Sequence, residues 1–192
     1  MRMQIDSLIL IGASTGGPGR IHQIIGALSP GFSPAIIIAQ HMAELFIPSF
    51  IKQIRTMTSL PVHEVDKPVP ILPGNIYVCT VTSRLVEQSD RIILEPFARK
   101  DFPYNPFINP LFASAALLKR STRKLGIILT GIGDDGAEGA LELFRSGGEC
   151  LFENEQSAVV YGMPKRALEL VPTARTGDVD TIIQTIISYG KH

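Results

Sequence analysis

Short, uninterrupted runs of Ile, Val and Leu recur along the chain and alternate with longer segments of mixed polarity. The first two runs lie at residues 7–11 and 35–39, and the segments that follow them, 19–29 and 46–57, are predicted helices. Strands that are apolar at every position suit a parallel sheet that is buried on both faces. Their alternation with helices indicates the α/β class.

The middle of the chain departs from this alternation. Residues 75–80, 84–87 and 91–95 are predicted strands, and the short turn at 88–90 predicts a β-hairpin inserted into the α/β frame. Residues 97–110 are rich in Pro, Asn and aromatic side chains, which indicates an ordered loop. The remaining predicted elements are helices at 110–119, 136–145 and 179–189, and strands at 61–64, 125–129 and 149–152.

Length and composition fit one domain with a full hydrophobic core, since 45% of the 192 residues are hydrophobic. The formal net charge is zero and no basic block stands out. This argues against a nucleic-acid partner, because phosphate binding needs clustered Lys and Arg. The longest apolar runs are too short to cross a bilayer, so we expect no membrane insertion, and the chain does not open on a signal-peptide pattern.

Cys79 and Cys150 are the two cysteines of the chain, and no metal-ligand spacing accompanies them. We interpret both as reduced core residues and predict neither a disulfide nor a metal site. Reduced thiols and the missing targeting pattern together predict a cytoplasmic protein.

Two glycine-rich turns follow predicted strands, at residues 12–19 and 131–136. In a parallel sheet such strand-to-helix turns lie together at the carboxyl edge, where the sites of α/β proteins form. The second turn matches the dinucleotide-binding pattern G-x-G-x-x-G, and Glu153 ends the next strand about 20 residues later. However, Asp134 and Asp135 stand where amides should hold a pyrophosphate, and their charges would repel it.

The first turn favours nucleophilic catalysis instead. Its G-x-S-x-G spacing, with Ser14 between Gly12 and Gly16, allows a sharp turn that lifts the hydroxyl above the sheet edge. The following helix N-terminus supplies amide donors for an oxyanion. The alternative interpretation is an ordinary Ser or Thr N-cap in a glycine-rich turn.

A nucleophilic serine needs a base, and the chain has four histidines. His41 follows the second strand and therefore shares the carboxyl edge with Ser14 if those strands are neighbours. His22 lies within the first helix, His63 stands in a short strand, and His192 is the last residue. His41 is therefore the predicted base.

The base needs an orienting carboxylate, and Asp134 and Asp135 follow the strand at 125–129 at the same edge. Either aspartate can bond an imidazole, or one or both can merely cap the helix at 136–145. The chain order Ser, His, Asp differs from the Ser, Asp, His order of α/β-hydrolases.

Four motifs stand in order along the chain: IGASTGGP at 11–18, QHM at 40–42, LTGIGDDGA at 129–137 and NEQSAVVYGMP at 154–164. Together they resemble the catalytic domain of the CheB family, the chemotaxis protein-glutamate methylesterases, and the likeness extends from about Leu8 to the last helix. The resemblance implies a doubly wound three-layer α/β/α sandwich, with a mostly parallel sheet and an antiparallel hairpin near one edge.

The resemblance also implies an activity and the residues that carry it. Ser14, His41 and Asp135 would form the catalytic triad, and the backbone amides of Thr15 and Ile132 would form the oxyanion hole. The substrates would be γ-methyl esters of glutamate on the cytoplasmic helices of methyl-accepting chemoreceptors, and receptor glutamines that are deamidated. No metal or organic cofactor is implied, and we expect a monomer.

Three features depart from the family pattern. Family members usually begin with a receiver domain, whereas this chain begins almost at the first predicted strand of the catalytic domain. We therefore expect residues 1–192 to form a single catalytic domain without a receiver and with constitutive activity. Ile132 stands where the family usually has Met, and PFIN at 106–109 replaces a Pro-Ser-Val-Asp segment on the substrate side. The alternative function is a receptor-binding module of the same fold with weak catalysis.

Overall fold

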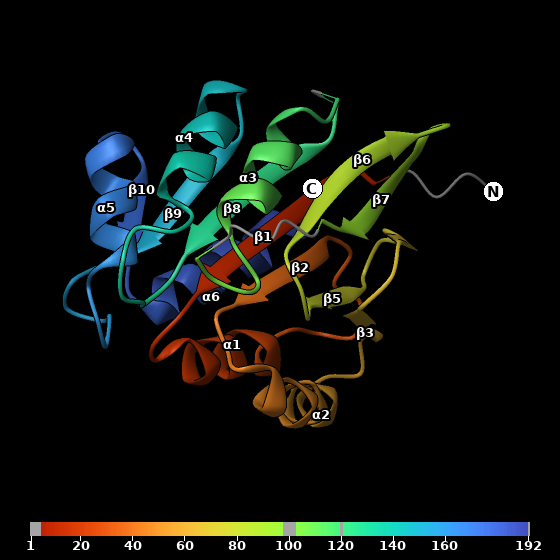
Figure 1. The fold of residues 1–192 in the computed structure, drawn as a ribbon, viewed down its shortest axis with the longest axis horizontal. Helices are drawn as coiled ribbons and strands as arrows, with labels where there is room; N and C mark the ends of the chain where they lie inside the picture. The colour runs from red at the N-terminus through yellow and green to blue at the C-terminus, as the bar shows by residue number, and fades with distance from the viewer. Residues whose placement is uncertain (1–4, 98–102, 120, 192) are drawn as a thin grey trace.

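The computed structural model describes residues 5–97, 103–119 and 121–191. Within them, the main sheet has seven strands in the order β10-β9-β8-β1-β2-β5-β3, and every neighbouring pair is parallel (Figure 1). The strands are β1 (Ser7–Ala13), β2 (Ala35–Gln40), β3 (Val62–Val65), β5 (Ile76–Cys79), β8 (Arg123–Ile128), β9 (Glu149–Glu153) and β10 (Arg175–Gly177).

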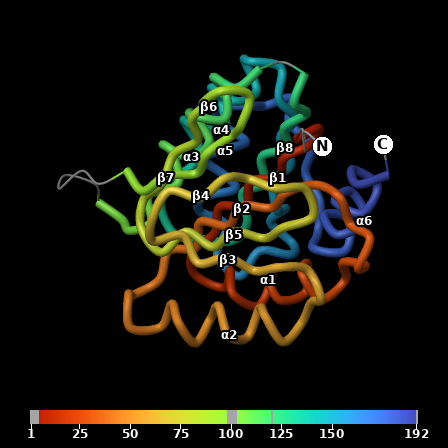
Figure 2. The backbone as a smooth tube through the Cα atoms, turned by 90° about the vertical axis from the view of Figure 1, so that its right-hand side faces the viewer, coloured from red at the N-terminus to blue at the C-terminus, as the bar shows by residue number. Residues whose placement is uncertain are grey.

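Helices cover both faces of this sheet. One face carries α1 (Gly17–Gly26), α2 (Ile47–Met57) and α6 (Val179–Tyr189), and the 3-10 helix η1 (Glu44–Phe46) leads into α2. The other face carries α3 (Asn109–Ala116), α4 (Ala137–Arg145) and α5 (Met163–Leu170). Figure 2 shows α1 and α2 below the sheet, and α3, α4 and α5 above it. The predicted doubly wound three-layer sandwich is confirmed.

The side chains of β1 explain why its strand is apolar throughout. Leu8 and Leu10 belong to the core under α3, α4 and α5. Ile9 and Ile11 belong to the core over α1, α2 and α6. Successive side chains of a strand point to opposite faces, so a strand covered on both sides needs an apolar residue at every position.

The small second sheet pairs β4 (Val69–Pro70), β7 (Arg91–Pro96) and β6 (Ser83–Gln88) in that order, all antiparallel. Leu85 and Leu94 pack in the same core as Tyr77 of β5, so this sheet covers the end of the main sheet near β5 and β3. The turn between β6 and β7 has positive φ at Ser89 and Asp90, 47° and 66°, which matches the twist of a tight hairpin. The predicted hairpin is confirmed.

Three elements lacked a sequence signal that we could recognise. Edge strand β10 buries only Gly177, so it has no apolar run, and β4 is two residues long and ends in Pro70. Helix α5 begins at the end of the motif at 154–164 and continues through residues for which no element was predicted. Within the predicted loop at 97–110, residues 98–102 lie outside the described residues, and 103–108 precede α3, which begins at Asn109.

Both cysteines are buried and unpaired, as predicted. Burial raises the pKa of Cys79 to about 12 and that of Cys150 to about 12, because a thiolate is poorly solvated in an apolar core. None of the described helices has the length and apolar character needed to cross a membrane.

The strand order reverses beside β1. The chain runs from β1 to β2 and on toward β5 and β3, and it later returns to place β8, β9 and β10 on the other side of β1. The turns that leave β1 and β8 therefore diverge to opposite faces of the sheet. Ligand sites of open α/β sheets form at the carboxyl ends of the strands at such a switch point.

Candidate active site

The three predicted triad residues follow three adjacent strands. Ser14 follows β1, His41 follows β2, and Asp135 lies in the turn after β8. Ala13 and Gln40 are register partners, so Ser14 and His41 leave the sheet side by side. Because β1 lies between β8 and β2, the Ser14 turn is flanked by the turns that carry the other two residues.

Ser14 is held by its own backbone. Its N–H donates to the carbonyl of Thr130 at 3.0 Å, and its carbonyl accepts from Gly17 N at 2.8 Å. The N-cap of α1 is Gly16, with a left-handed φ of 84° and no side-chain capping bond. The alternative interpretation of Ser14 as a helix cap is therefore wrong. Its side chain is half-buried and does not serve the helix.

The Ser14 turn lies against the turn that follows β8. A Cβ atom at Gly131 would lie 2.8 Å from Ser14 Cβ, closer than side-chain carbons approach one another. Only glycine at position 131 permits this contact. The second glycine-rich turn therefore packs directly against Ser14.

His41 and Asp135 form a short, partly buried hydrogen bond at this edge. His41 Nε2 lies 2.6 Å from Asp135 Oδ2, and the two side chains are 9% and 0% exposed. Asp135 also accepts hydrogen bonds from Ile108 N at 2.8 Å and Asn109 N at 2.9 Å. An ionised carboxylate only accepts, so Nε2 carries the hydrogen and Nδ1 keeps its lone pair.

No hydrogen bond joins the Ser14 hydroxyl to His41 among the residues that the structure describes. Ser14 and His41 nevertheless directly follow Ala13 and Gln40, which are register partners on the paired strands β1 and β2. Such bonds are often long before substrate binds and tighten in the reacting complex. The arrangement thus offers a serine beside a histidine with a free lone pair.

The neighbouring aspartate takes a different position. Asp134 is exposed, and its carbonyl accepts from Ala137 N at 3.1 Å. The N-cap of α4 is Gly136, again without a side-chain capping bond. Neither aspartate side chain caps the helix, so that alternative is wrong.

The two backbone amides predicted to hold an oxyanion are free of protein acceptors. Within the described part of the chain, Thr15 N and Ile132 N donate to no protein acceptor, whereas Gly131 N donates to Val160 O at 3.0 Å. Ile132 is 62% exposed, so its side chain is not needed in the core. Free amides in adjoining turns are the donors that an oxyanion requires.

Gln40 joins the serine and histidine turns, and the sequence interpretation missed it. Its Nε2 donates to the carbonyl of Ser14 at 2.9 Å and to the carbonyl of His41 at 2.8 Å. The residue is 4% exposed. The sequence signal that could have found it is its position: Gln40 is the one polar residue between the apolar run at 35–39 and the predicted base His41.

Glu153 is a second buried carboxylate at this edge. It is 0% exposed and accepts hydrogen bonds from Arg20 Nε at 2.8 Å, Ser157 Oγ at 2.7 Å and Thr130 N at 2.8 Å. Thr130 in turn accepts the Ser14 amide through its carbonyl. Glu153 therefore supports the Ser14 turn through Thr130. Its carboxylate already accepts three hydrogen bonds, so it is not free to hold a ribose as the dinucleotide pattern requires.

Comparison with known proteins agrees with this arrangement. The sequence model described as CheB methylesterase matches residues 9–186. The chain belongs to the CheB methylesterase family.

Relatives within this family match most of the chain. It is 36% identical over 160 residues to protein-glutamate methylesterase/protein-glutamine glutaminase 3 of Rhodospirillum rubrum, covering 82% of this chain and 43% of the relative. It is 33% identical over 187 residues to protein-glutamate methylesterase/protein-glutamine glutaminase 2 of Rhodopseudomonas palustris, covering 96% and 51%. The chain thus spans about half the length of these curated relatives.

A solved structure of the family has the same fold. The crystal structure of the Thermotoga maritima CheB methylesterase catalytic domain superposes with a TM-score of 0.87 at 28% sequence identity. The match covers 95% of this chain and 97% of that one.

The departure from the CheB family pattern at residues 106–109 is explained by packing. Ile108 is 0% exposed, and Asn109 Oδ1 accepts a hydrogen bond from Gly139 N of α4 at 2.9 Å. Asn109 therefore joins α3 to α4 through its side-chain oxygen.

The other histidines lie elsewhere in this CheB-family domain. His22 packs beside Phe50 at a ring-centroid distance of 5.6 Å, and burial lowers its pKa. His63 Nε2 is bonded to Asn75 Oδ1 at 2.7 Å on the strand β3. His192 lies outside the described residues. Among the described residues, no three His, Cys, Asp or Glu side chains are grouped so that they could hold a metal ion.

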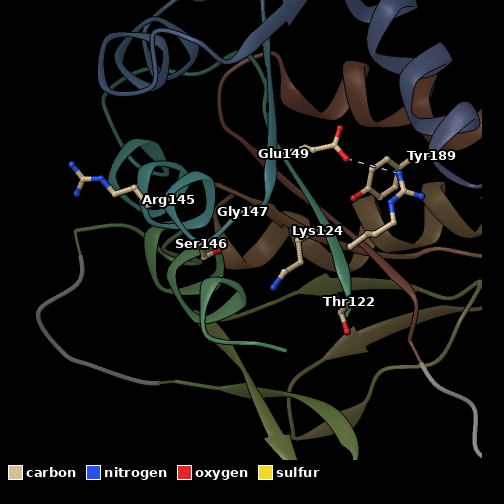
Figure 3. A pocket seen from close by; sticks show the side chains of 8 residues that line it. Thr122, Lys124, Arg145, Ser146, Gly147, Glu149 and Tyr189 are labelled. Atoms are coloured by element: carbon tan, nitrogen blue, oxygen red, sulfur yellow. Dashed lines mark ion pairs between the residues drawn. The ribbon is translucent and has the colours of Figure 1, made fainter. Parts of the chain in front are cut away.

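A separate hollow lies at the opposite edge of the sheet (Figure 3). It measures about 390 Å³ and is lined by the residues that begin β8 and β9, among them Arg123 and Glu149, which are 3.9 Å apart. Arg123 also lies over the ring of Tyr189 at 4.0 Å. Because the hollow is at the amino ends of the strands, it takes no part in the candidate active site of the CheB fold.

Proposed function

We propose that this chain is a serine hydrolase that removes methyl groups from γ-methyl-glutamate side chains of chemoreceptors. Ser14 is the nucleophile, His41 the base and Asp135 the orienting carboxylate. The observation that supports this most is the 2.6 Å bond between His41 Nε2 and Asp135 Oδ2, beside the Ser14 turn at the switch point. The names of the curated relatives support the same activity.

The first step of the proposed reaction forms an acyl-enzyme. His41 Nδ1 takes the proton of the Ser14 hydroxyl as its oxygen attacks the ester carbonyl. The amides of Thr15 and Ile132 bind the resulting oxyanion. The intermediate then collapses, the carbon–oxygen bond to the methoxy group breaks, and the proton on His41 passes to the departing methanol.

The second step releases the glutamate. His41 takes a proton from water, whose oxygen attacks the acyl carbon and forms a second oxyanion at the same two amides. Collapse of that intermediate returns the proton to Ser14 and leaves a glutamate carboxylate. Asp135 keeps Nε2 protonated and stabilises the imidazolium in both steps. A receptor glutamine would react in the same way with ammonia as leaving group.

The proposal includes the setting of the enzyme. Its partners are the cytoplasmic helices of methyl-accepting chemoreceptors, and the protein acts in the cytoplasm as a monomer. Residues 1–192 form one catalytic domain. The two-step reaction uses only water and groups of this chain.

Methanol release from methylated receptor membranes tests the function. We expect the purified chain to release methanol and Ser14→Ala to release none above background. A fluorophosphonate, which labels an activated serine, should mark the parent protein and spare Ser14→Ala. A folded parent protein that binds receptor membranes without releasing methanol would support the rival function, a binding module.

A further inference from the structure

Tyr104 lies flat against the imidazole of His41. The two ring centroids are 4.5 Å apart and the ring planes differ by 12°. Tyr104 remains 38% exposed, and a Cβ at Gly133 would lie 3.2 Å from its hydroxyl oxygen. The tyrosine thus extends from the histidine to the turn that carries Ile132.

The segment around Tyr104 is fixed at several points. Asn105 Oδ1 accepts from Thr82 N at 3.1 Å, and Phe107 N donates to Thr82 Oγ1 at 2.8 Å. The next amide, Ile108 N, donates to Asp135. One short segment therefore holds the orienting carboxylate and covers the face of the base.

A second histidine–tyrosine stack in the molecule provides a comparison. His63 and Tyr77 stack with centroids 4.9 Å apart and planes 17° apart. Tyr77 is 0% exposed, and its hydroxyl accepts from Leu72 N and donates to Pro70 O. That stack is explained by core packing. Tyr104 lies outside the core, because it is 38% exposed, its other ring neighbour is Phe107 at a centroid distance of 6.4 Å, and the described residues form no hydrogen bond to its hydroxyl.

We propose that Tyr104 is a positioning residue that acts through His41, an inference that rests on the proposed function. His41 is neutral before attack and becomes an imidazolium when it takes the Ser14 proton. An aromatic face attracts a cation more strongly than a neutral ring. The stack therefore stabilises the transition state more than the ground state, which raises kcat and leaves KM unchanged.

The test varies the ring at position 104. We expect Tyr104→Phe to keep kcat within about twofold, because the aromatic face is retained. Tyr104→Leu should lower kcat about 2- to 30-fold, the range given by a cation–aromatic contact, with KM within about twofold. Methanol release from receptor membranes and the rate of fluorophosphonate labelling are both measured. The matched control is His63→Ala, which removes the other stack and should leave both rates unchanged.

A series of phenylalanines with increasing fluorine content at position 104 separates electrostatics from packing. Fluorine withdraws charge from the ring face while nearly preserving its shape, so both rates should fall stepwise along the series. Rates that stay level along the series, or equal rates for Phe and Leu, would overturn the inference. If Tyr104→Leu does not fold, the fluorinated series still tests the inference. A parent protein that neither labels nor releases methanol would overturn the proposed function, and the inference with it.

Discussion

The two ends of helix α3 hold buried charges of opposite sign. At its beginning, the amides of Ile108 and Asn109 donate to the carboxylate of Asp135. Beyond its end, the carbonyls of Leu118 and Lys119 accept from the ammonium of Lys124 at 3.1 and 3.2 Å. The first arrangement follows from the free amides at a helix start and from the helix dipole, whereas the second satisfies two carbonyls of the turn that follows the helix.

The two charged side chains differ in the groups to which they are hydrogen-bonded. Asp135 also bonds His41, the proposed base that takes up and releases a proton during the reaction. Lys124, which is 4% exposed, donates to main-chain carbonyls at the amino edge of the sheet. Asp135 thus adjoins a proposed reacting group whereas Lys124 supports the main chain, and we expect the carboxyl edge to govern activity and the amino edge to govern stability.

The largest effect should come from the reacting groups at the carboxyl edge. Ser14→Ala and His41→Ala should each lower methyl-ester hydrolysis by about 10³-fold or more, the scale for loss of a triad member. Urea unfolding of Ser14→Ala should remain close to that of the parent protein, because this half-buried side chain lies outside the hydrophobic core, whereas His41→Ala should lower the free energy of unfolding because it removes a partner of the buried Asp135 carboxylate. Near-full activity of folded Ser14→Ala would refute the assignment of the nucleophile.

Exchange of the carboxylate at the start of α3 should have the next largest effect. Both oxygens of Asp135 accept from N–H groups, so the amide nitrogen of Asp135→Asn must face a donor. The amide also favours the wrong imidazole tautomer, and we expect a fall of about 10³- to 10⁴-fold in turnover. The control is Asp134→Asn, an exposed neighbour that should stay within about threefold. Equal rates for the two variants would contradict the comparison.

The smallest effect on activity should come from the other end of α3. Lys124→Met leaves two carbonyls without their donor, which should lower the free energy of unfolding by about 1–3 kcal/mol. Turnover per folded molecule should not change. Urea unfolding and methanol release are measured on the same preparation, with the exposed Lys52→Met as control. Loss of turnover in a folded Lys124→Met protein would show that the two edges are not independent.

Much of the fold could be predicted from the sequence because its signals are local. Strands β1, β2 and β8 contain apolar runs at 8–11, 35–39 and 125–128, since helices cover both faces of the sheet. The edge strand β10, with Arg175 and Thr176 exposed, lacks that signal because it is covered less completely.

The site was predictable only in part. Ser14 and His41 follow from the rule that turns after parallel strands meet at one edge. Spacing could not choose between Asp134 and Asp135, because the choice depends on amides at 108 and 109 that only the folded chain brings near. The contacts of Tyr104 with His41, and of Gln40 with two carbonyls, likewise join segments that have no common local pattern.

The position of β1 between β8 and β2 has a consequence for how the protein folds. His41 and Asp135 are 94 positions apart in the chain, and β2 and β8 flank β1 only after the long connection between them has closed. Contacts between distant segments close long loops and form late. When the denatured chain refolds, recovery of fluorophosphonate labelling should therefore trail recovery of helical circular dichroism, and its rate reports the assembly of the three central strands.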